Sequence, residues 1–139
     1  MRFYLDTNIL VFLLTGQYDE LDSRPYRLIE DYSSIALASS AAVCELIHLC
    51  QIGKIFRKKE KVKGENVIPW CEEKGINIVP VSKAHIQTYS ALPIYEDHRD
   101  PTDRLIVAQA ISDRIPLISS DSKFSRYNKH GLELVYNKR

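Results

Sequence analysis

Two acidic residues follow short apolar runs that have the composition of buried strands. Asp6 comes directly after the run "RFYL", and Asp121 lies shortly after the run "PLIS". In an open parallel sheet, the carboxyl ends of the strands lie along one edge, and ligands bind there. We therefore expect both carboxylates at the same edge of a sheet.

Two further acidic residues lie near the expected starts of helices. Glu45 stands in "SSAAVCELIHL" among small and apolar residues, and Asp103 stands in "HRDPTDRLIVAQA". Both helices connect strands of the same sheet, so their first turns are expected near the edge that holds Asp6 and Asp121. All four carboxylates can then line one cleft.

Several carboxylates cannot remain ionised close together in an apolar cleft unless a cation neutralises them. The four acidic residues offer only oxygen, which suits a hard ion such as Mg²⁺ or Mn²⁺. Such ions activate water and stabilise the leaving oxygen in phosphodiester hydrolysis. The pattern therefore predicts metal-dependent chemistry on a phosphodiester.

Each acidic residue also has an ordinary structural interpretation. Asp100 is a good N-cap before Pro101, and Asp103 fits a capping-box acid. Asp6 can cap a helix that begins near residue 8, Asp121 can stand in a turn, and Glu45 can reach solvent. These alternatives stay open at the level of the sequence.

The apolar pattern alternates between short β-branched runs and longer segments with apolar residues three or four positions apart. This alternation predicts an α/β fold, a three-layer α/β/α sandwich with a short, mostly parallel sheet of about five strands. The expected strands are 2–5, 35–38, 76–81, 116–119 and 132–136. The expected helices are 8–14, 23–32, 40–52, 65–74, 84–91 and 101–114.

The 139 residues fit a single domain spanning 1–139, and the net charge of +1 excludes a strong overall attraction to polyanions. No apolar run reaches the length of a membrane span. Three cysteines, an odd number without CxxC spacing, argue against a disulfide framework. A cytoplasmic protein without membrane contact is expected.

The only concentrated charge is the basic stretch Lys54 to Gly64, with six lysines and arginines against one glutamate. It is either a surface that binds a phosphate backbone or a solvated helix end or loop. The four histidines show no spacing typical of a zinc site, and we expect surface or capping roles for them.

The segments "YLDTNIL", "VCELIHLCQIGKI", "HRDPTDRLIVAQA" and "LISSD" resemble, in this order, PIN-domain ribonucleases, in particular VapC-type toxins of type II toxin–antitoxin systems. The resemblance implies a PIN-like fold, an acidic Mg²⁺ or Mn²⁺ site and endonucleolytic cleavage of RNA. It makes Asp6, Glu45, Asp103 and Asp121 the catalytic and metal-binding residues.

The resemblance also implies supporting roles around this site. Thr7 and Ser119 offer hydroxyls, Asn8 offers an amide and Asp100 supports the helix start, with local capping as the alternative. Arg99 and Arg104 are expected to meet RNA phosphates or antitoxin carboxylates, or else to be solvent-exposed. Two departures from the family pattern, Thr102 in place of an aromatic and Leu49 in place of a lysine, leave the ligands intact.

By the same resemblance, the partners are a structured RNA such as tRNA, a cognate antitoxin protein and a second copy in a homodimer. Two other functions remain as alternatives. A binding module of the same fold that does not cut RNA keeps the acids. A Mg²⁺-dependent phosphatase is disfavoured, because Asp6 is followed by Thr7 and Asn8 and not by a second aspartate one residue further on.

Overall fold

The centre of the protein is a sheet of five parallel strands. The computed structural model describes residues 1–138 and gives the strand order β5-β2-β1-β6-β7. The strands are β1 (Arg2–Leu5), β2 (Ile35–Ser39), β5 (Asn77–Val79), β6 (Leu117–Ser119) and β7 (Leu134–Tyr136).

Strand β1 lies in the middle of the sheet, between β2 and β6. Phe3, Tyr4 and Leu5 of this strand are at most 1% exposed. A parallel strand with helices on both faces buries every side chain, which explains why this run shows no polar alternation. The first polar side chain after it, Asp6, therefore marks the end of the strand.

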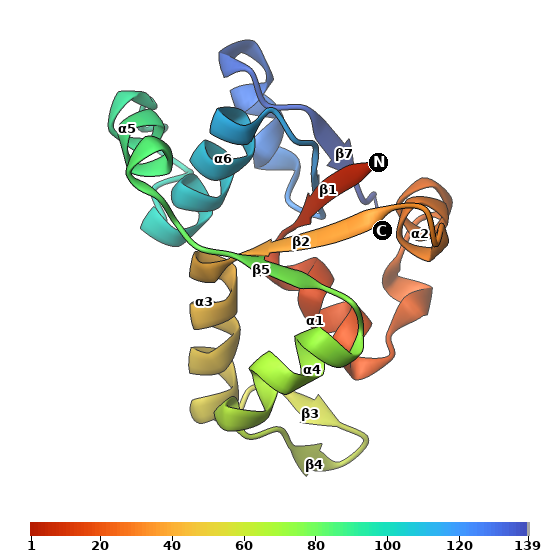
Figure 1. Ribbon diagram of the computed structural model, residues 1–139. Coiled ribbons are helices and arrows are strands. Elements are labelled where there is room, and N and C mark those ends of the chain that lie inside the picture. Colours follow the sequence, from red (N-terminus) through yellow and green to blue (C-terminus); the bar gives the residue numbers. More distant parts are fainter. Residues whose placement is uncertain (139) are drawn as a thin grey trace.

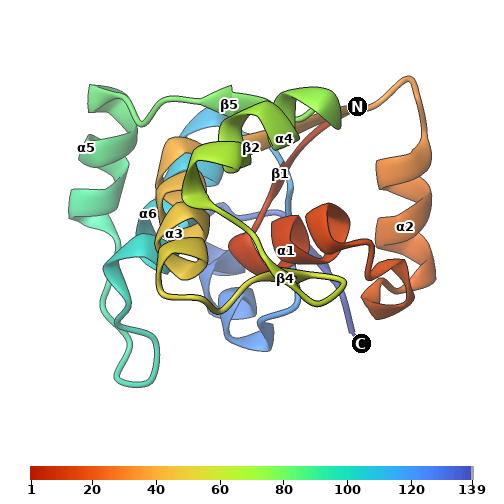
Figure 2. The same cartoon turned by 90° about the horizontal axis from the view of Figure 1, so that it is seen from below.

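Helices cover both faces of the sheet, as Figure 1 shows for α1 and α4 on one side and α5 and α6 on the other. The helices are α1 (Thr7–Thr15), α2 (Ser23–Glu30), α3 (Ser40–Gln51), α4 (Val67–Glu73), α5 (Lys83–Ala91) and α6 (Pro101–Asp113). Figure 2 shows α2 and α5 at opposite ends of the molecule. This arrangement confirms the three-layer α/β/α architecture.

Three of these helices begin directly at the carboxyl ends of strands or point their first turn there. Asp6 is the N-cap of α1, Ser39 at the end of β2 is the N-cap of α3, and Asp100 is the N-cap of α6, with proline at the first helical position. Short connections of this kind require polar caps at the sheet edge, and they concentrate polar side chains there.

The boundaries differ from the sequence prediction in a few places. Strand β5 ends at Val79 because Pro80 has no N–H for the ladder. The basic stretch forms neither a helix end nor a plain loop but a β-hairpin of β3 (Phe56–Arg57) and β4 (Glu60–Lys61). Three 3₁₀ helices were not expected: η1 (Tyr18–Glu20), η2 (Gly64–Asn66) and η3 (Ser122–His130).

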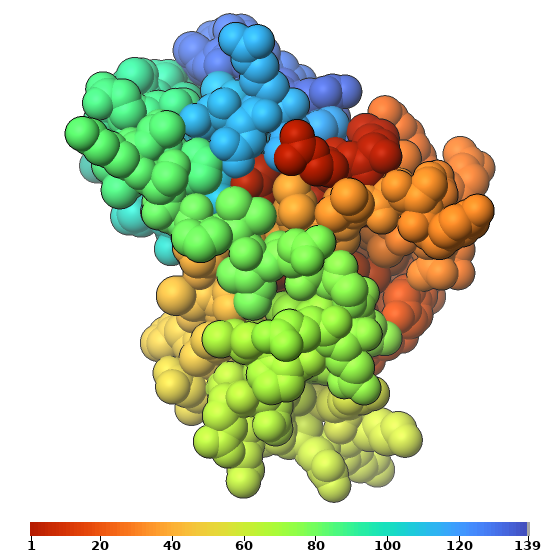
Figure 3. Space-filling model, in the orientation of Figure 1, coloured from red at the N-terminus to blue at the C-terminus, as the bar shows by residue number. Residues whose placement is uncertain are grey.

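The hairpin and α4 form a lobe at one end of the molecule. In the space-filling view of Figure 3, the yellow to light-green segment that contains them makes up the lower part of the face. Among the residues described, no helix is both long and apolar enough to cross a membrane.

Candidate active site

Asp6 lies at the floor of the candidate site and is only 3% exposed. Its Oδ1 accepts a hydrogen bond from the backbone N–H of Thr7 at 2.8 Å. Its Oδ2 accepts one from the hydroxyl of Ser119 at 2.7 Å. Asp6 is therefore both the cap of α1 and a carboxylate held rigidly at the end of β1.

Ser119, at the end of β6, links Asp6 at the end of β1 to Asp121 in the loop that follows β6. Besides donating to Asp6, its Oγ accepts the backbone N–H of Asp121 at 3.0 Å. Asp121 in turn accepts the backbone N–H of Lys123 at 2.9 Å and caps η3. The fully buried hydroxyl thus fixes Asp6 and Asp121 relative to each other across the neighbouring strands β1 and β6.

Asp100 and Asp103 have different roles at the start of α6. Asp100 accepts the backbone N–H of Thr102 at 2.9 Å and is the helix cap. Asp103, one turn further on, lies close to Asp100 and to Glu45 of α3, and one carboxylate oxygen from each lies within 4.8 Å of the other two. The cap therefore leaves Asp103 available to the cleft.

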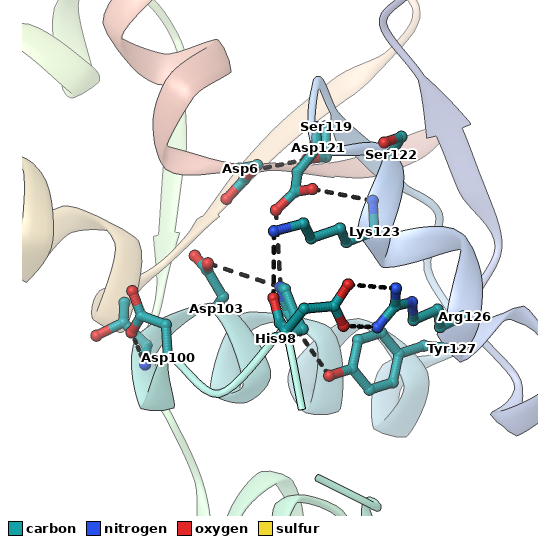
Figure 4. A network of polar contacts seen from close by, with 12 residues as sticks. Asp6, His98, Asp100, Asp103, Ser119, Asp121, Ser122, Lys123, Arg126 and Tyr127 are labelled. Atoms are coloured by element: carbon teal, nitrogen blue, oxygen red, sulfur yellow. Dashed lines mark hydrogen bonds and ion pairs between the residues drawn. The ribbon is translucent and has the colours of Figure 1, made fainter. Parts of the chain in front are cut away.

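A cleft of about 270 Å³ opens at this edge of the sheet. The structure brings all four expected acids into it, from four separate parts of the chain. Its lining residues are Asp6, Thr7, Asn8, Glu45, Leu49, Asp100, Asp103 and Asp121. Figure 4 shows Asp6, Asp103 and Asp121 directed toward a common space.

Burial and mutual repulsion raise the pKa values of two of these carboxyls. Burial is the largest cause for Asp6, and with the charges of Glu45 and Asp121 it raises the pKa to about 6 against the hydrogen bonds from Ser119 and Thr7. Burial, followed by the charges of Asp6, Asp100, Glu45 and Asp121, raises the pKa of Asp103 to about 7.

This electrostatic arrangement fits a bound divalent cation. The donor set consists of carboxylate oxygens that repel one another, and a 2+ ion between them removes that repulsion. Asp6, Glu45, Asp103 and Asp121 are placed to hold such an ion, with Asp100 beside them. Oxygen donors of this number and charge suit Mg²⁺ or Mn²⁺.

The neighbouring residues Thr7 and Asn8 occupy different surroundings. Thr7 is buried, its backbone N–H bonds to Asp6, and its hydroxyl has no hydrogen-bond partner among the described residues. Asn8 is exposed and lines the cleft. Asn8 is therefore free to meet a ligand, while Thr7 lines the cleft as a buried residue.

The two arginines that flank this helix start differ in exposure. Arg99 is exposed. Arg104 is only 6% exposed, its guanidinium donates to the backbone carbonyl of Leu92 at 3.1 Å, and it lies 4.8 Å from the centre of the Tyr89 ring. Arg104 joins α6 to α5 inside the fold, which agrees with neither a solvent-exposed residue nor a contact for RNA or an antitoxin.

His98 is a site residue that the sequence analysis missed. It is 4% exposed, and its Nε2 lies 3.7 Å from a carboxylate oxygen of Asp103 and 3.7 Å from one of Asp121. The expectation of a surface or capping role holds for His85, which forms a capping box with Ser82, but it is wrong for His98. Its position two residues before Asp100 was the only available signal.

A comparison with known protein families shows to which family this chain belongs. The PIN domain family matches residues 3–130. The chain belongs to the PIN-domain family. This membership confirms the resemblance seen in the sequence and agrees with the parallel sheet of this PIN domain. No curated protein matches the chain significantly.

Solved structures with the same fold include three toxin–antitoxin complexes. VapBC2 from Rickettsia felis, bound to a DNA fragment from its promoter, has a TM-score of 0.67 and 21% identity, and covers 99% of this PIN domain and 100% of its own chain. VapBC-5 from Mycobacterium tuberculosis has a TM-score of 0.65 and 18% identity, covering 97% and 98%. VapBC-1 from nontypeable Haemophilus influenzae has a TM-score of 0.64 and 19% identity, covering 98% of both.

Proposed function

We propose that this PIN domain is a metal-dependent endoribonuclease that hydrolyses RNA phosphodiester bonds with Mg²⁺ or Mn²⁺. One observation carries the proposal: Asp6, Glu45, Asp103 and Asp121 come from four separate segments and line one cleft. Placing these charges together is costly without a cation, and the raised pKa values of Asp6 and Asp103 report that cost.

The residues of the cleft would share the work as follows. Asp6, Glu45, Asp103 and Asp121 would hold the ion, which would supply activation of a water and stabilisation of charge on the phosphodiester oxygens. Ser119 fixes the orientation of Asp6 by donating to its Oδ2, and the same hydroxyl positions the backbone of Asp121. Rigid placement of Asp6 and Asp121 by Ser119 would reduce the entropic cost of positioning the reacting groups.

We further propose that the protein acts as the toxin of a toxin–antitoxin pair in the cytoplasm. The fold neighbours that are VapBC complexes support this role. In this role a small antitoxin covers the acidic cleft, two copies form a homodimer, and the substrate is a structured RNA such as tRNA. Arg99, exposed next to the cleft, is the side chain best placed to meet phosphates or antitoxin carboxylates.

The proposal is tested by incubating purified protein with total RNA in Mg²⁺, in Mn²⁺ and in EDTA, beside Asp6→Asn. We expect discrete cuts with either metal and none with EDTA or with Asp6→Asn. Asp22→Asn is a matched control, because Asp22 caps α2 through the N–H of the next residue, as Asp6 does for α1, but is not among the residues that line the cleft.

The control separates the loss of a helix cap from the loss of a metal ligand. Cleavage by Asp22→Asn at the wild-type rate, with none by a folded Asp6→Asn, supports the proposal. Metal-independent cutting, or RNA that is bound in EDTA and never cut with either metal, contradicts it and favours a binding module.

A further inference from the structure

His98 presents an unpartnered nitrogen to the acidic cleft. Its side chain is buried, and among the described residues its Nε2 has no hydrogen-bond partner. Oxygens of Asp103 and Asp121 each lie 3.7 Å from this nitrogen, and the three donor atoms lie within 4.8 Å of one another. A buried imidazole nitrogen that has no hydrogen-bond partner and lies beside two carboxylates is suited to bind a ligand.

The distances fit ligands around a shared ion better than direct hydrogen bonds. An N–H···O hydrogen bond has its atoms about 2.7 to 3.2 Å apart, so 3.7 Å is too long. Donors that each lie about 2.1 Å from a metal are separated by roughly 3.0 to 3.6 Å when they subtend about 90 to 120°. The spacing of 3.7 Å between His98 and each carboxylate lies just above this interval, so a small side-chain movement brings all three donors to a shared ion.

The imidazole ring is held in place by its surroundings. Its Nδ1 shares a hydrogen bond of 2.7 Å with the hydroxyl of Tyr127, and the ring packs edge-on against Phe124 with centroids 4.9 Å apart. Both aromatic side chains are fully buried on η3. Histidines that ligate metals commonly have their second nitrogen fixed in this way. Figure 4 shows His98 between Tyr127 and the cleft.

We propose that His98, Asp103 and Asp121 form a metal position with a nitrogen ligand inside the acidic cleft. In this position Nδ1 donates its proton to Tyr127 and Nε2 ligates the ion. Imidazole is a good ligand for transition ions and a poor one for Mg²⁺, so the position favours Mn²⁺ over Mg²⁺. The inference rests on the proposed function in sharing its cleft, but it concerns metal binding and is tested without RNA.

Pulsed electron paramagnetic resonance of the Mn²⁺-loaded protein tests the ligand directly. A ligating imidazole couples its ¹⁴N nucleus to the bound Mn²⁺. We expect this coupling in the wild type and its loss in His98→Gln, with Mn²⁺ affinity reduced by about tenfold or more and Mg²⁺ affinity reduced less. His48→Gln, a change on the exposed surface of α3, is the matched control and should keep the coupling.

The wild-type spectrum decides even if His98→Gln does not fold. Bound Mn²⁺ without nitrogen coupling, no binding of Mn²⁺ at all, or a coupling that survives in folded His98→Gln overturns the inference. If the protein cleaves RNA but its bound Mn²⁺ shows no nitrogen coupling, the proposed ribonuclease function is supported and the nitrogen-ligated metal position is contradicted. Coupling in a protein that cuts no RNA would support the metal position and contradict the ribonuclease.

Discussion

The acidic cleft and the basic hairpin both concentrate charge, but they differ in how far their charged side chains are exposed to water. In the cleft, Asp6 is buried and Asp103 is partly buried, and their pKa values rise to about 6 and about 7. The stretch from Lys54 to Gly64 carries six basic side chains, and all of these are exposed. The cleft opposes folding in the absence of a counter-ion, whereas the hairpin charges stay hydrated.

Among the described residues, the hairpin contacts α4 and Gly53 through packing and not through ion pairing. Arg57 lies 5.6 Å from the centre of the Trp70 ring, and Lys61 covers Gly53, where an added Cβ would lie 3.1 Å from Nζ. Lys58 at the turn has a φ of 61°, a left-handed conformation that favours glycine. Buried charge is costly and therefore indicates a candidate functional site, whereas exposed charge remains hydrated and carries no such cost.

The largest expected effect comes from Asp103→Asn, which should change activity and stability in opposite directions. Loss of a metal ligand should lower RNA cleavage by more than about 100-fold, beyond the loss typical of outer-shell changes. Removal of a carboxylate that is repelled by its neighbours should raise the free energy of unfolding in EDTA. Cleavage rates and urea unfolding measure the two effects, and a variant that loses both would indicate a structural role.

The second prediction concerns pH and the metal-free protein. The folded pKa values of Asp6 and Asp103 lie above the unfolded value near 4, so the folded state binds more protons and loses stability as pH rises from about 4 to about 8. Asp6 alone should account for about 3 kcal/mol.

Urea unfolding in EDTA at pH 4 and pH 8 measures this loss, and saturating Mg²⁺ should recover most of it at pH 8. Asp6→Asn isolates the contribution of Asp6 from other titrating groups. An equal pH dependence in wild type and Asp6→Asn would show that Asp6 is not the source.

A smaller effect is expected from Ser119→Ala. The change removes the donor to Asp6 and the acceptor for the N–H of Asp121, without removing a carboxylate. Cleavage should fall by about 10 to 100-fold, as for other groups that orient ligands. In the wild type, the hydrogen bond from Ser119 lowers the pKa of Asp6, so the loss of this bond should raise that pKa. The rise of activity with pH should therefore move to higher pH. An unchanged pH profile would argue against this coupling.

The smallest effect is expected at the hairpin, in Lys58→Gln combined with Lys59→Gln. RNA binding in EDTA should weaken, and the slope of log affinity against log salt should fall by about 1 to 2. The cleavage rate at saturating RNA should not change. Lys83→Gln with Lys138→Gln removes the same charge elsewhere on the surface, and an equal effect of both pairs would show that the hairpin is not special.

Local signals in the sequence were strong enough to predict most of the elements and the four acids. Phe3 to Leu5 and Pro116 to Ile118 form short apolar runs, as buried parallel strands require, and proline after Asp100 indicates a helix start. The hairpin escaped prediction because its turn, Lys58 and Lys59, contains neither glycine nor asparagine.

The sequence by itself determined the order of strands and helices, and with it the edge at which Asp6, Glu45, Asp103 and Asp121 meet, because strand ends and helix caps are set by nearby residues. Only the tertiary structure decided between neighbours in "HRDPTDR". His98 turns into the cleft, Arg99 faces solvent and Arg104 is buried against Tyr89. The packing of α5 and η3 on α6 makes these distinctions, and such contacts join residues that are distant in the chain.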